Sequence, residues 1–299
     1  MGPESAASPV LVVGEALIDI VRAPNTSPQE HVGGSPANVA LGLGRLGVPV
    51  RFRTAIGRDA RGRRIADHLA ASGVAVDERS FCLSRTSTAV ANISAGGEAR
   101  YEFDLGWRLD EAVELGASRI VHVGSVGCYL EPGAGVLLAK LRSWAGKAQV
   151  TFDPNIRPAL VGERDAARKR TEEIATFCEV VKLSDQDAAW LYPGHSIERI
   201  VNRFQGLGAR VVAVTMGSEG AIMASSEAQV AVPAVLVKAV DTVGAGDTFM
   251  AAIVASVAAG ELGSDRASLL AAGRRSARAA AITVGRRGAD LPTRAELPD

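Results

Sequence analysis

The stretch DTVGAGDTF occupies residues 241–249 and places a carboxylate directly behind a glycine-rich turn. An uncharged apolar run, MAAIVASVAA, follows at residues 250–259 and is typical of a buried helix. The turn is therefore expected at a helix N-terminus, where backbone amides lack intrahelical acceptors and favour an anion. Asp247 beside such a site suits a base that takes a proton from a hydroxyl while the amides stabilise a transferring phosphoryl group. An ordinary turn with an acidic first-turn residue is the alternative interpretation.

Short apolar runs alternate with helical patterns along the rest of the chain. The runs are typical of buried parallel strands and lie at residues 10–13, 119–123, 149–152, 180–183 and 211–215. Helical patterns lie between them at residues 36–46, 62–72, 133–145, 164–177, 185–191 and 196–205. This alternation predicts an α/β fold in which helices cover both faces of a mostly parallel sheet.

Two segments have the two-residue period of half-buried strands instead. Residues 18–22 and 87–104 alternate apolar and polar side chains, and Gly96 with Gly97 indicates a hairpin turn in the second segment. We therefore expect a small antiparallel β lid, formed by about residues 16–32 and 86–106, on a single domain that spans residues 1–299. Such a lid suits closure over a ligand, or pairing with its own copy in a homodimer.

Composition favours a small-molecule partner. The 299 residues include 33 Lys plus Arg and 33 Asp plus Glu, so neither nucleic acid nor an anionic membrane is expected as a partner. The longest uncharged apolar segment, residues 249–259, is shorter than the ~20 residues that cross a bilayer. Three widely spaced cysteines and the lack of a secretory signal indicate a cytoplasmic protein.

Two polar side chains near the N-terminal end of the chain are placed to hold hydroxyl groups. Asp19 follows the first buried strand, where a carboxylate can accept hydrogen bonds from two neighbouring sugar hydroxyls. An exposed surface aspartate is the alternative. The motif GGSPAN at residues 33–38 opens a helix, its glycines allow close approach of a ligand, and Asn38 lies one turn into the helix.

Two further motifs follow strands at the edge where open α/β sheets bind ligands. In DPNIRP, at residues 153–158, Arg157 suits a phosphate or an oxygen-rich substrate. VTMGSEGA, at residues 214–221, joins a strand to a glycine-rich turn that suits nucleotide phosphates or ribose, although a plain tight turn is equally compatible.

Other sequence signatures of nucleotide-binding proteins and hydrolases are either missing or in the wrong structural context. GLGRLG at residues 42–47 matches the dinucleotide fingerprint, but it ends a predicted helix instead of opening one, so an NAD-dependent dehydrogenase is disfavoured. The chain has no P-loop motif, no G-x-S-x-G elbow and no metal-ligand spacing among its four histidines.

The motifs together resemble the ribokinase-like (PfkB) carbohydrate kinases. The resemblance runs from about residue 10 to residue 292 and includes GEALID at residues 14–19 and KLSDQD at residues 182–187. The pairing of GEALID with GGSPAN, and of DPNIRP with KLSD, is most similar to bacterial fructokinases. The resemblance implies a three-layer sandwich and ATP-dependent phosphorylation of a primary hydroxyl, with D-fructose to fructose 6-phosphate as the leading reaction. A 2-keto-3-deoxygluconate kinase, a ribokinase, or a catalytically silent sugar or nucleotide sensor are the alternatives.

The resemblance also implies a role for each matched position. Asp247 would be the base, with Arg157 and an anion hole at Gly244, Ala245 and Gly246. The sugar would be held by Asp19, Gly33, Gly34, Asn38, Asn155, Arg157 and Asp247, and by Phe103, which we expect to shape the pocket with Asp104 and Trp107. The nucleotide would contact Lys182, Ser184, Thr215, Gly217, Gly220, Gly244 and Gly246. ATP would come with Mg²⁺ near Asp187, and a monovalent cation such as K⁺ would lie at Asp241 and Val243.

Overall fold

The computed structural model describes residues 8–24, 26–94, 96 and 99–297. Its centre is a nine-stranded sheet whose strands are, in spatial order, β15 (Gln229–Val232), β14 (Ala221–Ala224), β13 (Val211–Thr215), β12 (Val180–Ser184), β11 (Gln149–Asp153), β10 (Ile120–Gly124), β1 (Val10–Val13), β4 (Val50–Arg53) and β6 (Val74–Val76). Neighbouring strands from β13 to β6 are parallel, whereas β13, β14 and β15 form an antiparallel edge. The five strands predicted from apolar runs are present, and β4, β6, β14 and β15 are additional to those five.

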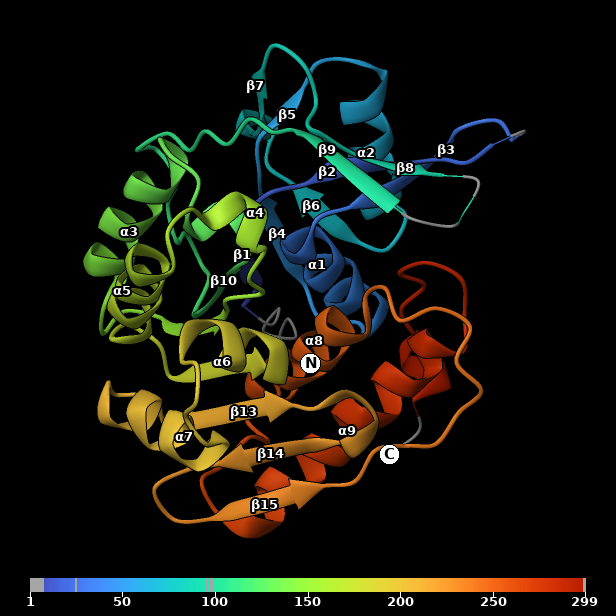
Figure 1. Ribbon diagram of the computed structural model, residues 1–299. Coiled ribbons are helices and arrows are strands. Elements are labelled where there is room, and N and C mark those ends of the chain that lie inside the picture. Colours follow the sequence, from blue (N-terminus) through green and yellow to red (C-terminus); the bar gives the residue numbers. More distant parts are fainter. Residues whose placement is uncertain (1–7, 25, 95, 97–98, 298–299) are drawn as a thin grey trace, which may run out of the picture.

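Helices cover both faces of this sheet, as Figure 1 shows. One face packs against α1 (Ser35–Arg45), α2 (Ala60–Ala70), α8 (Ala245–Ala258) and α9 (Arg266–Val284). The other packs against α3 (Gly133–Trp144), α5 (Arg164–Ala175), α6 (Asp185–Leu191) and α7 (Ile197–Gly206). The central strands are buried on both faces, which explains their continuous apolar sequences. The expected α/β fold with a mostly parallel sheet is confirmed.

A second sheet of four strands stands beside the main one at the top of Figure 1. Its order is β3 (Gln29–Gly33), β2 (Leu17–Arg22), β8 (Thr88–Ile93) and β9 (Ala99–Asp104). The expectation of an antiparallel sheet is wrong for the central pair, because β2 and β8 are parallel. Each outer pair is an antiparallel hairpin, but a long excursion separates the two hairpins and lets them join in parallel. Gly97 of the expected turn lies outside the described residues.

The two faces of the small sheet differ in character. Ile18, Ile20 and Val90 on one face are buried in the core beneath α2. Asp19 lies on the opposite face, because side chains alternate along a strand. Ala89 and Phe103 are its register partners across β8 and β9, so they share that face. No helix in the described part of the chain is long and apolar enough to span a membrane.

Candidate active site

The first turn of α8 presents free backbone amides. Gly244 adopts the left-handed conformation, with φ 80°, and no side chain caps the helix. Among the described residues, the Ala245 amide donates to the Thr242 carbonyl at 3.3 Å, but the amides of Gly246 and Asp247 have no acceptor. This helix end has the partial positive charge that attracts anions.

The Asp247 carboxylate is held by two donors from the first turn of α1. Ser35 Oγ donates to Oδ1 at 2.6 Å, and Asn38 Nδ2 donates to Oδ2 at 2.7 Å. Asp247 is buried, with 8% of its surface exposed. Sequence analysis selected Asn38 but missed Ser35, although a hydroxyl at a helix start within GGSPAN was an available signal.

Gly33 and Gly34 allow close packing around Asp19. A Cβ atom on Gly33 would lie 2.0 Å from Asp19 Oδ2, so the carboxylate rests directly over this glycine. Gly34 has φ 102°, and its Cβ would lie 2.7 Å from the Glu15 carbonyl oxygen. Substitution at either position would therefore disturb the placement of Asp19 or the turn before α1.

Asp19 shares its space with other charged groups of the site. Burial raises the pKa of its carboxyl to about 6, and the negative charge of Asp247 adds to this effect. His31 and Arg157 act in the opposite direction and lower the pKa of the same group. The structure thus places two other predicted residues, Arg157 and Asp247, within electrostatic reach of Asp19.

Two non-glycine residues with left-handed backbones follow neighbouring strands at the same edge of the sheet. Asn155, after β11, has φ 40°, and Ser125, after β10, has φ 54°. Arg157 is exposed, and its Nη1 donates to Asn155 Oδ1 at 2.8 Å. Such backbone strain is concentrated at functional sites, because surrounding contacts must hold it in place.

Glu15 is a buried acid that sequence analysis did not select. Its Oε2 accepts a hydrogen bond from the Gly127 amide at 2.8 Å. Burial raises its pKa to about 7, although hydrogen bonds from Ser125 and Gly127 act to lower it, and the charge of Asp247 contributes a further increase. Its position within GEALID, where apolar residues surround it, was the available signal.

Lys182 is a buried residue beside the N-terminal end of α8. Its Nζ forms a buried ion pair with Asp153 Oδ2 at 2.8 Å, and a Cβ atom on Gly246 would lie 3.1 Å from this nitrogen. The structure therefore places Lys182 against the first turn of α8. Asp153, the first residue of DPNIRP, was not selected from the sequence as a site residue.

Asp187 and Ser184 form a capping box at the start of α6. Asp187 Oδ1 accepts from the Ile156 amide at 2.7 Å, and Oδ2 accepts from the Ser184 amide at 3.0 Å. Each carboxylate oxygen of Asp187 thus has one backbone partner, which fixes the carboxylate at the start of α6. Within the described ranges, no group of three His, Cys, Asp or Glu side chains is arranged to hold a metal ion.

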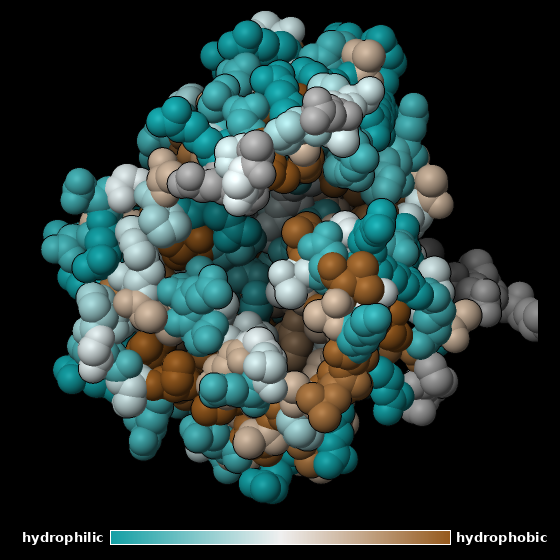
Figure 2. All heavy atoms as spheres, turned by 45° about the vertical axis from the view of Figure 1, so that its right-hand side comes forward, coloured by the Kyte–Doolittle hydropathy of each residue, from teal (hydrophilic) through white to brown (hydrophobic). Residues whose placement is uncertain are grey.

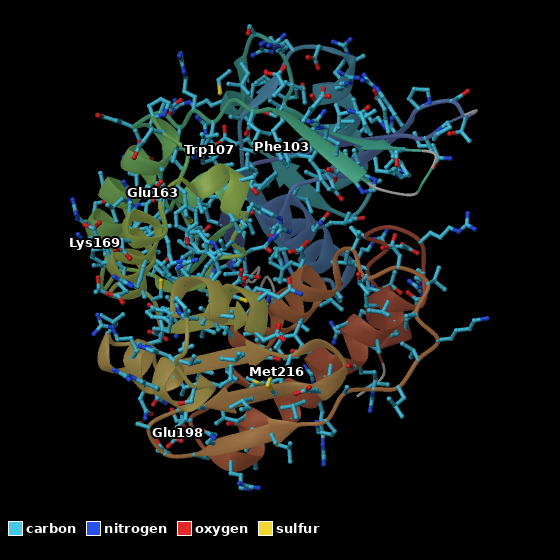
Figure 3. The ribbon with its side chains drawn as sticks, in the orientation of Figure 1. Phe103, Trp107, Glu163, Lys169, Glu198 and Met216 are labelled. Atoms are coloured by element: carbon cyan, nitrogen blue, oxygen red, sulfur yellow. The ribbon has the colours of Figure 1, made fainter. Side chains whose placement is uncertain are left out.

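The turn after β13 carries the other expected nucleotide residues. Thr215 ends the strand half-buried, and Gly217 is exposed with φ 53° and open space around its Cα. Gly220 is buried, and a Cβ on it would lie 2.1 Å from the Val232 carbonyl oxygen. Gly220 is therefore required by the turn itself, whereas Gly217 is free to face a ligand. The turn can be found in Figure 3 by the label of Met216, which lies between Thr215 and Gly217.

Asp241 joins two loops beside the start of α8. Its Oδ1 accepts from the Val243 amide at 3.0 Å, and its Oδ2 accepts from the Gly288 amide at 2.9 Å. Both oxygens of the Asp241 carboxylate thus hold backbone amides, which ties the turn before α8 to the loop after α9.

The three aromatic and acidic lid residues have different positions. Phe103 is 40% exposed and stacks on Tyr101, with ring centroids 6.1 Å apart, on the Asp19 face of the small sheet. Asp104 pairs with Thr88 in register and so points to the opposite face, where it forms an ion pair with Arg85. Trp107, labelled in Figure 3, is buried, and Gly133 at the start of α3 packs against its ring.

One face of the molecule is hollowed beside the small sheet (Figure 2). Figure 2 shows a depression near the centre of this face, below the small sheet at the top, with hydrophilic side chains along much of its rim. Buried carboxylates close to a helix N-terminus suit a hydroxylated substrate and an anionic one side by side.

Comparisons with known proteins agree with this chemistry. Fructokinase of Rhizobium leguminosarum bv. trifolii is 32% identical over 260 residues, covering 83% of this chain and 79% of the relative. Fructokinase of Klebsiella pneumoniae is 33% identical over 264 residues, covering 84% of each chain. A double mutant of fructokinase from Vibrio cholerae O395, solved with fructose, ADP and potassium ion bound, has a TM-score of 0.83 and 25% identity, covering 97% of both chains. Residues 8–296 match the family described as pfkB family carbohydrate kinase. The predicted family and enzyme class are thereby confirmed, and the chain belongs to the pfkB family of carbohydrate kinases.

Proposed function

We propose that this protein transfers the γ-phosphate of ATP to the 6-hydroxyl of D-fructose. The observation that carries the proposal is the position of Asp247, whose buried carboxylate lies in the same helical turn as the free amides of α8. The carboxylate suits removal of the hydroxyl proton, and the amides suit the charge that develops on the phosphoryl group.

The sugar would bind between the small sheet and α1. Asp19, held over Gly33, would accept hydrogen bonds from its hydroxyls, while Asn38 and Asn155 would contact it from the main domain. Phe103 is a partly exposed apolar surface on the Asp19 face, suited to covering one side of a sugar ring. The fructokinase relatives and the fructose-bound Vibrio cholerae structure favour fructose over ribose or 2-keto-3-deoxygluconate.

Catalysis would depend mainly on how the protein positions the substrate hydroxyl, the Asp247 carboxylate and the γ-phosphate relative to one another. Ser35 and Asn38 each occupy one site on the Asp247 carboxylate, and each oxygen retains a lone pair for the substrate hydroxyl. Once deprotonated, the hydroxyl oxygen would attack the γ-phosphorus in line, with Lys182 and the α8 amides against the phosphate oxygens. Arg157, exposed at the rim, would contact the sugar or the transferring phosphate.

Divalent and monovalent cations would assist the nucleotide. Mg²⁺ commonly binds through substrate phosphates and waters with one or two carboxylates, which agrees with the described residues forming no dedicated acidic cage. Potassium, present in the Vibrio cholerae structure, would contact carbonyl oxygens at Asp241 and Val243.

The small sheet would act as a lid and as a dimer surface. Its edge strand β9 exposes Tyr101 at 61% and Phe103 at 40%, and an unpaired strand edge is a surface on which a second copy can pair. We also place the enzyme in the cytoplasm, since Cys82, Cys128 and Cys178 are free thiols.

A coupled ADP-release assay tests the proposal. The purified protein is incubated with MgATP and, in turn, fructose, ribose, 2-keto-3-deoxygluconate and a nucleoside, and ³¹P NMR identifies the phosphorylated position. The highest kcat/KM is expected for fructose, with fructose 6-phosphate as product. Turnover confined to another sugar would replace fructose, and binding without turnover on every compound would favour the silent sensor.

A further inference from the structure

A buried ion pair lies at the carboxyl edge of two central strands. Phe152 pairs with Val181 in register, so the next residues, Asp153 and Lys182, are cross-strand neighbours. Lys182 Nζ and Asp153 Oδ2 are 2.8 Å apart, and the side chains are 4% and 0% exposed. Asp153 Oδ1 has no hydrogen-bond partner among the described residues. A carboxylate left half-satisfied in the interior is costly to the fold, which indicates a function for the pair beyond stability.

The ammonium of this pair points to the anion site. A Cβ atom on Gly246 would lie 3.1 Å from Lys182 Nζ, so the nitrogen is packed against the first turn of α8. The amides of Gly246 and Asp247 are the free donors of that turn within the described chain. An anion at this helix end would therefore meet the ammonium and the amides together.

Burial alone would work against a charged lysine at this position. Desolvation lowers the pKa of Lys182, but the adjacent charge and hydrogen bond of Asp153 reverse the effect, so that its pKa lies above the ordinary value. Asp187 and Asp247 act in the same direction from α6 and α8. His122, on β10, is the remaining titratable neighbour, and burial followed by the charge of Lys182 lowers its pKa to about 3, so it adds no positive charge.

We propose that Asp153 is a positioning residue that keeps Lys182 protonated and aimed at the phosphate site when the nucleotide displaces water from it. Asp153 is too deep in the sheet to touch a substrate, so it acts only through Lys182. The inference rests on the proposed kinase function. It deepens that function because it identifies Asp153 as the negative charge that keeps the Lys182 ammonium stable once water has left the site.

The test compares Asp153→Asn, Lys182→Met and the double variant with the wild type between about pH 7 and about pH 9, a range that begins above the pKa of Asp153, which burial raises to about 6. For each protein, ADP affinity is measured by calorimetry and kcat by ADP release. Lys182→Met is expected to lower kcat by about 10²–10³, the typical loss for one donor to a developing anion. In Asp153→Asn, ADP affinity and kcat should fall progressively as pH rises, because the unpaired ammonium loses its proton. The double variant should match Lys182→Met instead of adding a second loss.

Asp77→Asn is the matched control, since Asp77 pairs with the buried Arg53 at 3.0 Å, outside the site. It is expected to lower thermal stability without changing the shape of the pH profile. Asp153→Ser, which leaves room for water, provides the same comparison if Asp153→Asn does not fold. A wild-type pH profile in the Asp153 variant, or losses that multiply in the double variant, would overturn the inference. A wild type that binds ADP but phosphorylates no sugar would instead refute the proposed function, and the ADP titrations would still test the ion pair.

Discussion

Asn38 and Asp247 are 209 residues apart in sequence, yet Asn38 Nδ2 donates a hydrogen bond to Asp247 Oδ2 at 2.7 Å. The contact joins the first turn of α1, which directly follows Gly33 and Gly34, to the first turn of α8, which carries the free amides. With Ser35 on the other oxygen, it fixes both the rotation and the position of the carboxylate. The first turns of two helices far apart in the sequence therefore converge on a single side chain.

Asp247→Asn tests this convergence directly. The amide keeps the volume of the side chain but cannot take the proton of a hydroxyl, so kcat should fall by about 10²–10⁴ while sugar and ADP affinities change little. Steady-state kinetics and calorimetry provide the two measurements. Asp265→Asn, at the exposed N-cap of α9, is the control and should leave kcat unchanged. Less than about a tenfold loss in Asp247→Asn, or 1.4 kcal/mol of barrier, would exclude this residue as the base.

Gly33→Ala should impair sugar binding without affecting the nucleotide. The new Cβ would lie 2.0 Å from Asp19 Oδ2, so the carboxylate must move. We expect at least about a tenfold rise in KM for the sugar, equivalent to about 1.4 kcal/mol, and unchanged ADP affinity. Gly206→Ala is the control, because its Cβ would have open space around it. An unchanged KM for every sugar in the Gly33 variant would show that Asp19 is not a sugar ligand.

The pH dependence of stability should report the buried Glu15. Its folded pKa, about 7, exceeds the ordinary 4.5 because of burial, so between these values the folded state holds a proton that the unfolded state has lost. The free energy of unfolding should therefore fall by up to about 3 kcal/mol as pH rises through this window. The stabilising contribution of Glu15 is complete below the window and is lost above it.

Glu15→Gln removes this contribution and isolates it from other titrating groups. Urea unfolding, followed by circular dichroism from about pH 4 to about pH 8, should show the variant gaining stability relative to the wild type as pH rises. The exposed Glu114, changed to Gln, is the control. Parallel curves for wild type and Glu15→Gln would mean that Glu15 ionises normally in the folded protein.

Asp241→Asn should weaken the response to potassium. Asp241 accepts hydrogen bonds from the amides of Val243 and Gly288, and its amide analogue can accept only one of them. The turn that would supply carbonyl ligands then loses its shape. We expect the ratio of kcat in potassium chloride to kcat in tetramethylammonium chloride to fall towards one, whereas exposed Asp67→Asn should keep the wild-type ratio. If the wild type itself is insensitive to potassium, the cation site is refuted.

The local pattern of apolar residues was sufficient to predict the layered fold. The strands that the sequence predicted, and the helices between them, agree with the structure to within a few residues, because burial on both faces of a strand or along one stripe of a helix leaves a local period. The start of α8 was predicted for the same reason: a glycine at the left-handed position and an apolar run behind it are adjacent in the chain. Strands β14 and β15 were missed; β15, at the edge of the sheet, alternates exposed and buried side chains over only four residues and so lacks the continuous apolar run that identified β1.

Motifs also predicted which residues gather, but not what each one contacts. Asp187 matched a nucleotide-site motif, and only the structure showed that the Ile156 and Ser184 amides use both of its oxygens. Trp107 follows the lid in sequence, but packing against Gly133 draws it into the core. Contacts of this kind depend on how separate elements dock.

The sequence by itself determined the order of strands and helices, the glycine-rich helix start and the acidic residue within it, since each is encoded by neighbours along the chain. Tertiary structure alone decided that Ser35 and Asn38 hold Asp247, that Asp153 pairs with Lys182 and that two hairpins join through parallel strands. The physical reason is that these contacts depend on strand register and helix docking, which arise from burial summed over the whole core and leave no local trace in the sequence.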